Sequence, residues 1–279
     1  MVNTTDIGDN MASALEESKL PKQQARQRAI ADAVMSEGSI RIEQLAERFG
    51  ISLMTVHRDL DELESRGLLR KSRGLATALS SSLVESSDVY RLGQQAPLKH
   101  ALAEAALQFL EPGQSLMLDD STTVLHLAKM LGAKTPLTVI TNVLTLMNEL
   151  KGVRGISLVA LGGTYHNWCS AFMGSMTAEA IGRLRADVFV MSTAAITDDI
   201  CFFQSEDTVQ TKRAMFEVAA KRILLVDHTK FERRALHALA SLSEFDHVIV
   251  DSQTSQEHID RLRSRGVDVI VASSTPSHS

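Results

Sequence analysis

Residues 52–60, Ser-Leu-Met-Thr-Val-His-Arg-Asp-Leu, combine an apolar stripe with polar and cationic faces. The stripe consists of Leu53, Val56, Leu60 and Leu63, which recur at intervals of three and four and therefore predict an amphipathic helix. Arginine, histidine and threonine side chains on the other faces can reach base edges or phosphates in a DNA groove. The sequence therefore predicts a DNA-reading helix whose contacts come from Ser52, Met54, Thr55, His57 and Arg58.

The flanking residues predict how this helix is held. Residues 41–49 form a shorter amphipathic segment, and Gly50 ends it because glycine readily adopts the left-handed conformation. Ser52 then supplies an N-cap oxygen for the second helix. A helix, a glycine-containing turn and a second helix with a cationic face indicate a helix-turn-helix.

Residues after the second helix predict a β-hairpin wing. Short strands at 68–70 and 75–77 flank the turn 71–74, and the stretch from Arg66 to Arg73 holds four cations and no acid. We expect Lys71 and Arg73 to grip phosphate. An ordinary helical hairpin with a solvated basic turn is the alternative. A first helix over 22–37 is expected to bury Ala29, Ile30, Ala33 and Val34, and a strand at 40–42 to close against the wing.

Composition and charge are those of a two-domain globular chain. The 279 residues are 44% hydrophobic and 23% charged, and no apolar run approaches the ~20 residues of a membrane span. Residues 21–80 carry 10 Lys and Arg against 8 Asp and Glu, although the whole chain has a net charge of −5. Cys169 and Cys201 lack metal-type spacing, which fits buried thiols in a reducing cytoplasm. The expected parts are a disordered arm, a DNA-binding domain, a linker, an effector-binding domain and a disordered tail, at 1–20, 21–78, 79–97, 98–272 and 273–279.

The second half alternates apolar runs with helical patterns. Such strand–loop–helix units predict a mostly parallel α/β sheet. Strands are expected at 115–118, 137–140, 156–161, 188–191, 223–226, 247–250 and 267–271, and helices at 98–110, 176–184, 207–220 and 256–265, with two more that end near 131 and 150.

Polar clusters follow several of these strands, at the sheet edge where ligands of parallel sheets bind. Asp119 and Asp120 can accept hydrogen bonds from sugar hydroxyls, and Lys230 offers a point charge for phosphate. Thr122 and Thr123 begin a helix, where backbone N–H groups favour an anion. The alternative is that these are only caps and turn residues. The candidate effector-binding residues at this edge are Asp119, Ser121, Thr122, Thr123, Thr141, Asn142, Gly162, Gly163 and Lys230.

Over roughly residues 22–271 the chain resembles DeoR-type bacterial transcriptional regulators. The N-terminal motif reads Arg26, Ile30, Val34, Ser52, Thr55, Val56, His57, Arg58, Asp59 and Leu60. The sensor motifs read Asp119 with Thr122–Thr123, Thr141–Asn142, Leu161–Gly163, Phe172 with Gly174, Lys212–Met215, and Asp227 with Lys230–Phe231.

The resemblance implies a ribose-5-phosphate-isomerase-like sensor domain, with Lys212 among its effector residues. It also implies a phosphorylated sugar or sugar-derived effector that alters operator binding, usually by relieving a repressor. Ser121 replaces a usual glycine, and residues 192–200 lack glycines expected there. A side chain at Ser121 takes space, or adds a hydroxyl, where the ligand meets the backbone.

Two other functions are considered. A sugar-phosphate isomerase or hydrolase with a DNA-binding appendage would need a complete catalytic set, and Asp119, Asp120, His126, Asp227 and Lys230 do not supply one. A protein-interaction module could use the winged helix without DNA. The sequence predicts no enzyme activity, cofactor or metal. It predicts a cytoplasmic repressor that binds double-stranded operator DNA as a homodimer or homotetramer, because paired half-sites need paired readers.

Overall fold

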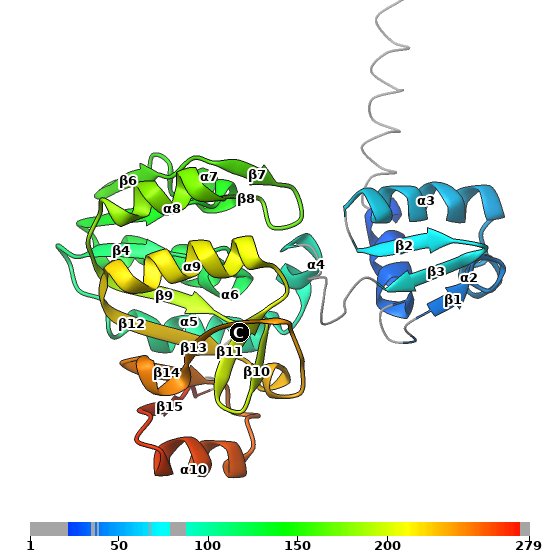
Figure 1. The fold of residues 1–279 in the computed structure, drawn as a ribbon. Helices are drawn as coiled ribbons and strands as arrows, with labels where there is room; N and C mark the ends of the chain where they lie inside the picture. Colours follow the sequence, from blue (N-terminus) through cyan, green and yellow to red (C-terminus); the bar gives the residue numbers. More distant parts are fainter. Residues whose placement is uncertain (1–21, 35–36, 38, 67, 79–87, 274–279) are drawn as a thin grey trace, which may run out of the picture. The chain divides into compact units, whose positions relative to one another are not determined.

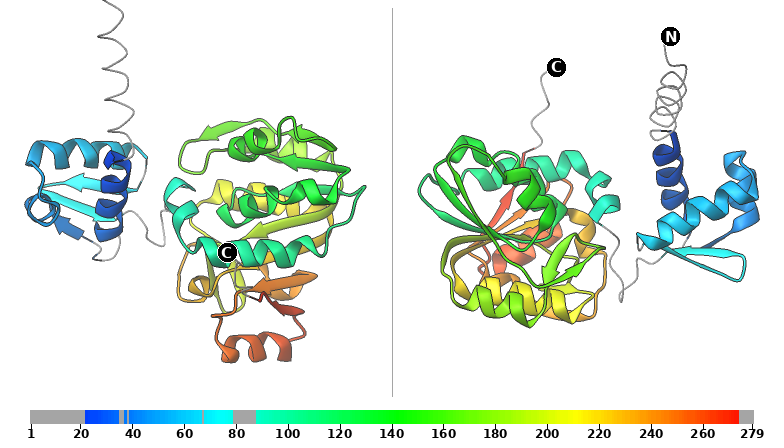
Figure 2. Two further views of the ribbon diagram at one scale, coloured as in Figure 1. Left: turned by 180° about the vertical axis from the view of Figure 1, so that it is seen from behind. Right: turned by 90° about the horizontal axis from the view of Figure 1, so that it is seen from above.

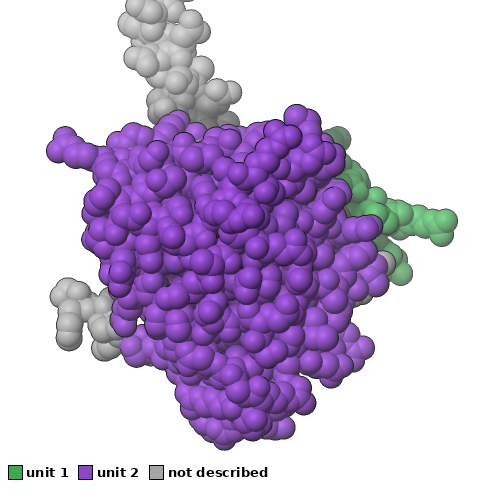
Figure 3. All heavy atoms as spheres, turned by 60° about the vertical axis from the view of Figure 1, so that its left-hand side comes forward, with its two compact units in different colours: residues 1–80 green, residues 81–279 purple. Residues whose placement is uncertain are grey.

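In the computed structural model the described residues are 22–34, 37, 39–66, 68–78 and 88–273. The chain divides into two compact units, residues 1–80 and 81–279 (Figure 3). The arm expected at 1–20 lies outside the described residues, and of the tail expected at 273–279 only Ser273 lies within them.

The first unit is a winged helix-turn-helix. A helix over 22–34 precedes β1 (Ser39–Arg41), α2 (Ile42–Phe49), α3 (Leu53–Ser65), β2 (Leu69–Ser72) and β3 (Leu75–Ala78) (Figure 1). The three strands form an antiparallel sheet in the order β1-β3-β2. Gly50 ends α2 at a φ of 61°, and the Ser52 hydroxyl accepts a hydrogen bond from the Thr55 amide at 3.2 Å. The predicted end of α2 at Gly50, the predicted N-cap of α3 at Ser52 and the predicted wing are therefore confirmed.

Two buried positions were predicted wrongly in this unit. Leu53 is 47% exposed, because it is the first residue of α3 and precedes the part of the helix that packs on the core. Ala29 is exposed, and the buried face of the first helix instead includes Gln27 and Ala31. That face is rotated because the Gln27 amide points inward and donates to Asp59 and Glu62 on α3.

The second unit contains a seven-stranded sheet whose observed neighbours are all parallel, in the order β15-β14-β12-β9-β4-β5-β6. Its strands are β4 (Ser115–Leu118), β5 (Leu137–Thr141), β6 (Ile156–Ala160), β9 (Ala186–Ser192), β12 (Ala219–Val226), β14 (His247–Val250) and β15 (Val269–Val271). Successive strands after β4 proceed toward one edge, and those after β9 toward the other. The switch point of the topology therefore lies between β4 and β9.

Helices cover both faces of this sheet (Figure 2). One face packs against α5 (Ala96–Leu107), α6 (Thr122–Ala128) and α7 (Leu144–Leu150), and the other against α8 (Ser175–Gly182), α9 (Glu206–Val218) and α10 (Gln256–Ser264). Strand side chains alternate accordingly, since Leu116 and Leu118 join the first core and Met117 joins the second. The predicted mostly parallel α/β fold is confirmed, with helices on both faces of the sheet.

The structure adds elements that the sequence pattern did not predict. An antiparallel pair, β7 (Thr164–His166) and β8 (Ala171–Met173), follows β6, and a small sheet joins β10 (Ala195–Thr197), β11 (Ile200–Phe203) and β13 (His237–Ser241). A short helix, α4 (Asp88–Gly93), lies within the segment expected to be linker. These elements are only three to six residues long, too short for periodicity to identify.

The glycines that residues 192–200 lack are replaced by a two-aspartate turn. Asp198 and Asp199 both have positive φ, 50° and 60°, between β10 and β11. The buried carboxylate of Asp199 accepts from Arg261 at 2.9 Å and from Arg265 at 2.5 Å. These ion pairs hold a backbone conformation that aspartate tolerates better than most residues.

Candidate functional site

The outer face of α3 presents the predicted DNA-reading side chains to solvent. Met54 is 79% exposed, and His57 and Arg58 are also exposed. Neither Arg58 nor His57 has a carboxylate partner among the described residues. Thr55 is half-buried and its hydroxyl lies 2.9 Å from that of Ser52, so Ser52 and Thr55 build the start of the helix.

A buried ion pair anchors α3 from behind. The Asp59 carboxylate is fully buried and accepts from Arg26 Nε at 2.6 Å and from Gln27 Nε2 at 3.2 Å. Because Asp59 follows Arg58 in the sequence, this contact fixes the face from which Arg58 projects. Sequence analysis placed Arg26 and Asp59 in the family motif without assigning their contact.

The two wing cations have different surroundings. Lys71 forms an ion pair with Asp61 of α3, and its backbone N–H donates to Glu64 at 2.9 Å. Arg73 is exposed at the hairpin turn, where it adopts a φ of 48° beside Gly74 at 77°. Arg73 therefore presents its charge to solvent, whereas Lys71 would have to exchange a carboxylate for a phosphate.

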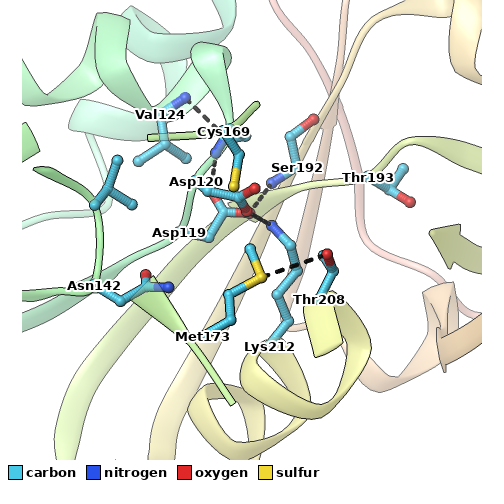
Figure 4. Close-up of polar contacts among 12 residues, drawn as sticks. Asp119, Asp120, Val124, Asn142, Cys169, Met173, Ser192, Thr193, Thr208 and Lys212 are labelled. Atoms are coloured by element: carbon cyan, nitrogen blue, oxygen red, sulfur yellow. Dashed lines mark hydrogen bonds and ion pairs between the residues drawn. The ribbon is translucent and has the colours of Figure 1, made fainter. Parts of the chain in front are cut away.

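A buried charged cluster lies at the carboxyl end of β4, beside the switch point (Figure 4). Lys212 Nζ, from α9, lies 2.5 Å from Asp119 Oδ2 and 2.5 Å from Asp120 Oδ1. Asp119 also accepts from the Ser121 amide at 3.0 Å and from the Ser192 amide, at the end of β9, at 3.2 Å. The structure thus brings together Asp119 and Ser121 of the loop after β4, Ser192 of β9 and Lys212 of α9.

The electrostatics of this cluster follow from burying one cation with two carboxylates. Burial opposes the charge of Lys212, but Asp119 and Asp120 outweigh it and raise the pKa of Lys212 to about 12. Burial raises the pKa of Asp119 above its ordinary value, whereas Lys212 overcomes burial and lowers the pKa of Asp120. With both carboxylates ionised the cluster carries one net negative charge, which suits hydroxyl donors better than a phosphate.

Two further lysines form a cationic group near this cluster. Lys99 of α5 is buried and donates to Thr122 Oγ1 at 2.8 Å and to the carbonyl oxygen of Arg91. Burial, and next the nearby charge of Lys230, lower the pKa of Lys99 to about 7. Lys230 Nζ lies 3.9 Å from Asp227 Oδ2, and this cation helps to lower the pKa of Asp227 against the effect of burial.

Lys99 was not among the predicted effector residues. The available signal was a lysine close to Leu98, Ala101 and Leu102 in a helix predicted to pack on the sheet. A buried lysine is costly unless it bonds or binds something, so its position marks it as a candidate ligand group.

Some of the remaining predicted effector residues present polar groups at the sheet edge, and others hold the local structure in place. The Asn142 side chain donates to the Phe172 carbonyl at 2.7 Å, and its buried Oδ1 has no partner among the described residues. Thr141 Oγ1 donates to the Leu118 carbonyl at 3.0 Å and accepts from the Val143 amide, so it ties the ends of β4 and β5 together. Thr123 is buried in α6, and the Ser121 hydroxyl caps that helix by accepting from Val124 at 3.2 Å.

Gly162 and Gly163 lie between β6 and β7. A Cβ at Gly163, where φ is 154°, would come within 2.0 Å of Thr177 Oγ1. The close approach of α8 therefore already requires glycine at this position. Gly162 is exposed, and an added Cβ would meet nothing within 4 Å.

Two other classes of site were sought in the same residues. In the part of the chain that the structure describes, no three His, Cys, Asp or Glu side chains gather as a metal ion would need. No described helix is long and apolar enough to cross a membrane.

Comparison with known proteins matches both units. Residues 26–82 match the DeoR-like helix-turn-helix domain, and residues 94–252 match the DeoR C terminal sensor domain. The putative aga operon transcriptional repressor of Escherichia coli O157:H7 is 27% identical over 97% of this chain and 99% of its own length. The glycerol-3-phosphate regulon repressor of Escherichia coli K12 is 30% identical over 83% of this chain and 92% of its own.

A solved ribose 5-phosphate isomerase A from Methanocaldococcus jannaschii aligns with 49% of this chain and 55% of its own, at 14% identity and a TM-score of 0.36. That similarity is too weak to bear on function. The two domain matches cover most of the described residues, and the named relatives are regulators. The chain belongs to the DeoR family of DNA-binding transcriptional regulators.

Proposed function

We propose that this regulator represses carbohydrate catabolism genes and that a phosphorylated sugar or sugar derivative, bound at the carboxyl edge of the parallel sheet, changes its affinity for operator DNA. The names of two relatives, which refer to the aga operon and to glycerol 3-phosphate, support a carbohydrate signal. The observation that carries the proposal is that the sheet edge has a cationic group, Lys99 and Lys230, and an acidic group, Asp119 and Asp120.

Each half of that edge suits a different part of a sugar phosphate. Lys99 and Lys230 provide the cations for a phosphate, and binding one would oppose the effects of burial and of the nearby Lys230 charge, which lower the pKa of Lys99. The carboxylates of Asp119 and Asp120 and the unpartnered Oδ1 of Asn142 accept hydrogen bonds, as sugar hydroxyls require. Lys212 acts in this proposal by holding the two carboxylates in place.

On the DNA side, Arg58, His57 and Met54 would contact base edges or adjacent phosphates from α3. Arg73 would grip phosphate from the wing, and Lys71 would join it after leaving Asp61. Ser52 and Thr55 would contribute at the start of the helix. The protein would act in the cytoplasm on double-stranded DNA as a homodimer or homotetramer, since helix-turn-helix readers use paired half-sites.

Fluorescence anisotropy with DNA from upstream of the protein's own gene tests this function. Wild-type protein should bind one segment specifically, and one member of a panel of sugar phosphates should weaken that binding while its unphosphorylated parent does not. A ligand that strengthens binding would contradict repression relieved by the effector, and enzymatic conversion of a sugar phosphate by the pure protein would contradict the regulatory role.

An Arg154→Ala variant is the matched control for cation removal from the reading helix, because Arg154 is an exposed arginine of the second unit. It should bind the operator as the wild type does. Equal losses of specific binding in Arg58→Ala and Arg154→Ala would mean that overall charge, and not the reading helix, governs binding.

A further inference from the structure

A partly enclosed cavity of about 160 Å³ lies beside the charged cluster of the second unit. Asp120, Ser121 and Thr122, the loop after β4, form its polar side. It therefore adjoins the place proposed above for the sugar hydroxyls. Its volume suits a substituent of a ligand and is small for a whole sugar phosphate.

The rest of the cavity is mainly apolar. Leu92 of α4, Leu125 of α6 and Leu146 of α7 line it, together with Val143 and Cys169. The Cys169 thiol is no charged partner for a ligand, because burial raises its pKa well above the ordinary range. Cys169 Sγ lies 3.7 Å from the His166 carbonyl, so its weak donor is already directed at the backbone.

Six polar residues also line the cavity, Asp88, Asp120, Ser121, Thr122, Thr145 and Ser170, and those of the loop after β4 have partners. Thr122 Oγ1 accepts from Lys99, Ser121 Oγ accepts from Val124, and Asp120 is paired with Lys212. A water molecule in such a space needs two to four polar partners, and an apolar group needs none. The lining therefore favours an alkyl or acyl group over a hydroxyl.

We propose that this cavity is a specificity subsite for a small apolar substituent of the effector, so that the preferred ligand is a sugar phosphate bearing an N-acyl or deoxy-methyl group. The proposal rests on the proposed function, because the cavity adjoins the effector edge through Asp120, Ser121 and Thr122. The phosphate meets Lys99 and Lys230, the hydroxyls meet Asp119 and Asn142, and the apolar group enters the cavity.

The position of Leu92 gives this subsite a second consequence. α4 is the first described element of the second unit, and it is bonded to the effector edge by Lys99, which donates to the Arg91 carbonyl and to Thr122. An apolar group in the cavity touches Leu92 on the same helix. The substituent thus contacts the first described element of the second unit.

Isothermal titration calorimetry on the full chain tests the subsite with matched ligand pairs. Hexosamine 6-phosphates are compared with their N-acetyl derivatives, and hexose 1-phosphates with 6-deoxyhexose 1-phosphates. The wild type should bind the substituted member of at least one pair about tenfold more tightly than its parent. Leu92→Trp, which fills the cavity, should abolish that preference and keep the affinity for the parent.

Leu144→Trp is the control, because Leu144 is 37% exposed on α7 and does not line the cavity. It should keep the preference. Retained binding of the parent phosphate shows that each variant is folded. Val143→Ala, which enlarges the cavity, should shift the preference toward a larger acyl group.

The possible results distinguish failure of the subsite from failure of the proposed function. Equal binding of both members of every pair, or a preference that survives Leu92→Trp, overturns the subsite and leaves a phosphorylated effector standing. If none of the phosphates binds, the proposed function fails, and the subsite fails with it.

Discussion

Arg58 on α3 and Lys212 on α9 are both cations assigned to binding, yet their surroundings are opposite. Arg58 is exposed and unpaired among the described residues, on a helix held from behind by Asp59. Lys212 is almost completely buried and bonded to two carboxylates. The first can be available to a polyanion without rearrangement. Lys212 already has two carboxylate partners, and it contributes to the site by setting the position and net charge of those carboxylates.

This difference shows that a cationic side chain is not a ligand-binding group by its residue type alone. A buried lysine between two aspartates stabilises the protein and orients hydrogen-bond acceptors. A buried lysine such as Lys99, whose neighbours include another lysine, keeps capacity for an anion.

Removing the buried cation should have the largest effect. Lys212→Met leaves Asp119 and Asp120 buried without their counter-ion, and should lower the free energy of unfolding of the second unit by about 3–5 kcal/mol. Urea unfolding can be followed through Trp168, the chain's single tryptophan, which lies in the second unit. Lys151→Met, at an exposed lysine, is the control. A loss no greater than that of the control would show that the cluster is not held by charge.

The buried carboxylate of the first unit should matter for stability as well. Asp59→Ala strands the donors of Arg26 and Gln27 and should destabilise that unit by about 1–3 kcal/mol, since Arg26 can regain water. Hydrogen exchange of the α3 amides measures the change. Asp61→Ala is the matched control on the same helix, because that side chain is 60% exposed. Equal protection in both variants would disprove the anchoring role.

Removing the exposed cation should instead weaken DNA binding alone. Arg58→Ala should reduce operator affinity by about 1–3 kcal/mol, if the guanidinium reads a base, and leave the unfolding free energy nearly unchanged. Anisotropy titration at fixed salt, repeated on a non-specific duplex, measures the loss and its sequence dependence. An unchanged affinity in the folded variant would remove Arg58 from the reading surface.

The smallest expected effect is the pH dependence of effector binding. The pKa of Lys99 is about 7, below its ordinary value, and a phosphate beside Lys99 would raise it by stabilising the charged form. The protein should therefore take up a proton on binding, and affinity should fall as pH rises above about 7, by at most about tenfold per unit. Calorimetry between about pH 7 and pH 9, where a sugar phosphate is already fully ionised, measures this slope. Lys99→Met should flatten it, and an unaltered slope would place the titrating group elsewhere.

The two regions also differ in how far their structure followed from the sequence. In the first unit, Gly50, Ser52 and the spacing of Val56, Leu60 and Leu63 are local signals, and the helix boundaries and wing agree with them. Leu53 was misplaced because periodicity does not show where along a helix the packing begins, and Ala29 because it does not fix the rotation of a buried face. That rotation depends on contacts between Gln27 and residues of α3, more than 30 positions away.

In the second unit the parallel sheet and its polar carboxyl edge were predicted, because apolar runs and the residues that follow them are also local signals. The pairing of Lys212 with Asp119 spans 93 positions and could not be derived from spacing. The contact that excludes a side chain at Gly163 is also long-range, since it comes from Thr177 of α8. Long-range partners decide which polar residues bind a ligand and which support the fold.

We propose that a phosphorylated effector bound by Lys99 and Lys230 changes the affinity of the DNA-reading helix for its operator. Operator titrations of the wild type and of a Lys99→Met/Lys230→Met variant, each with and without the active sugar phosphate, test it most directly. We expect the variant to bind the operator as tightly as the wild type without ligand, and to show no response when the sugar phosphate is added. A variant that binds operator normally and still responds fully to the sugar phosphate would contradict the claim.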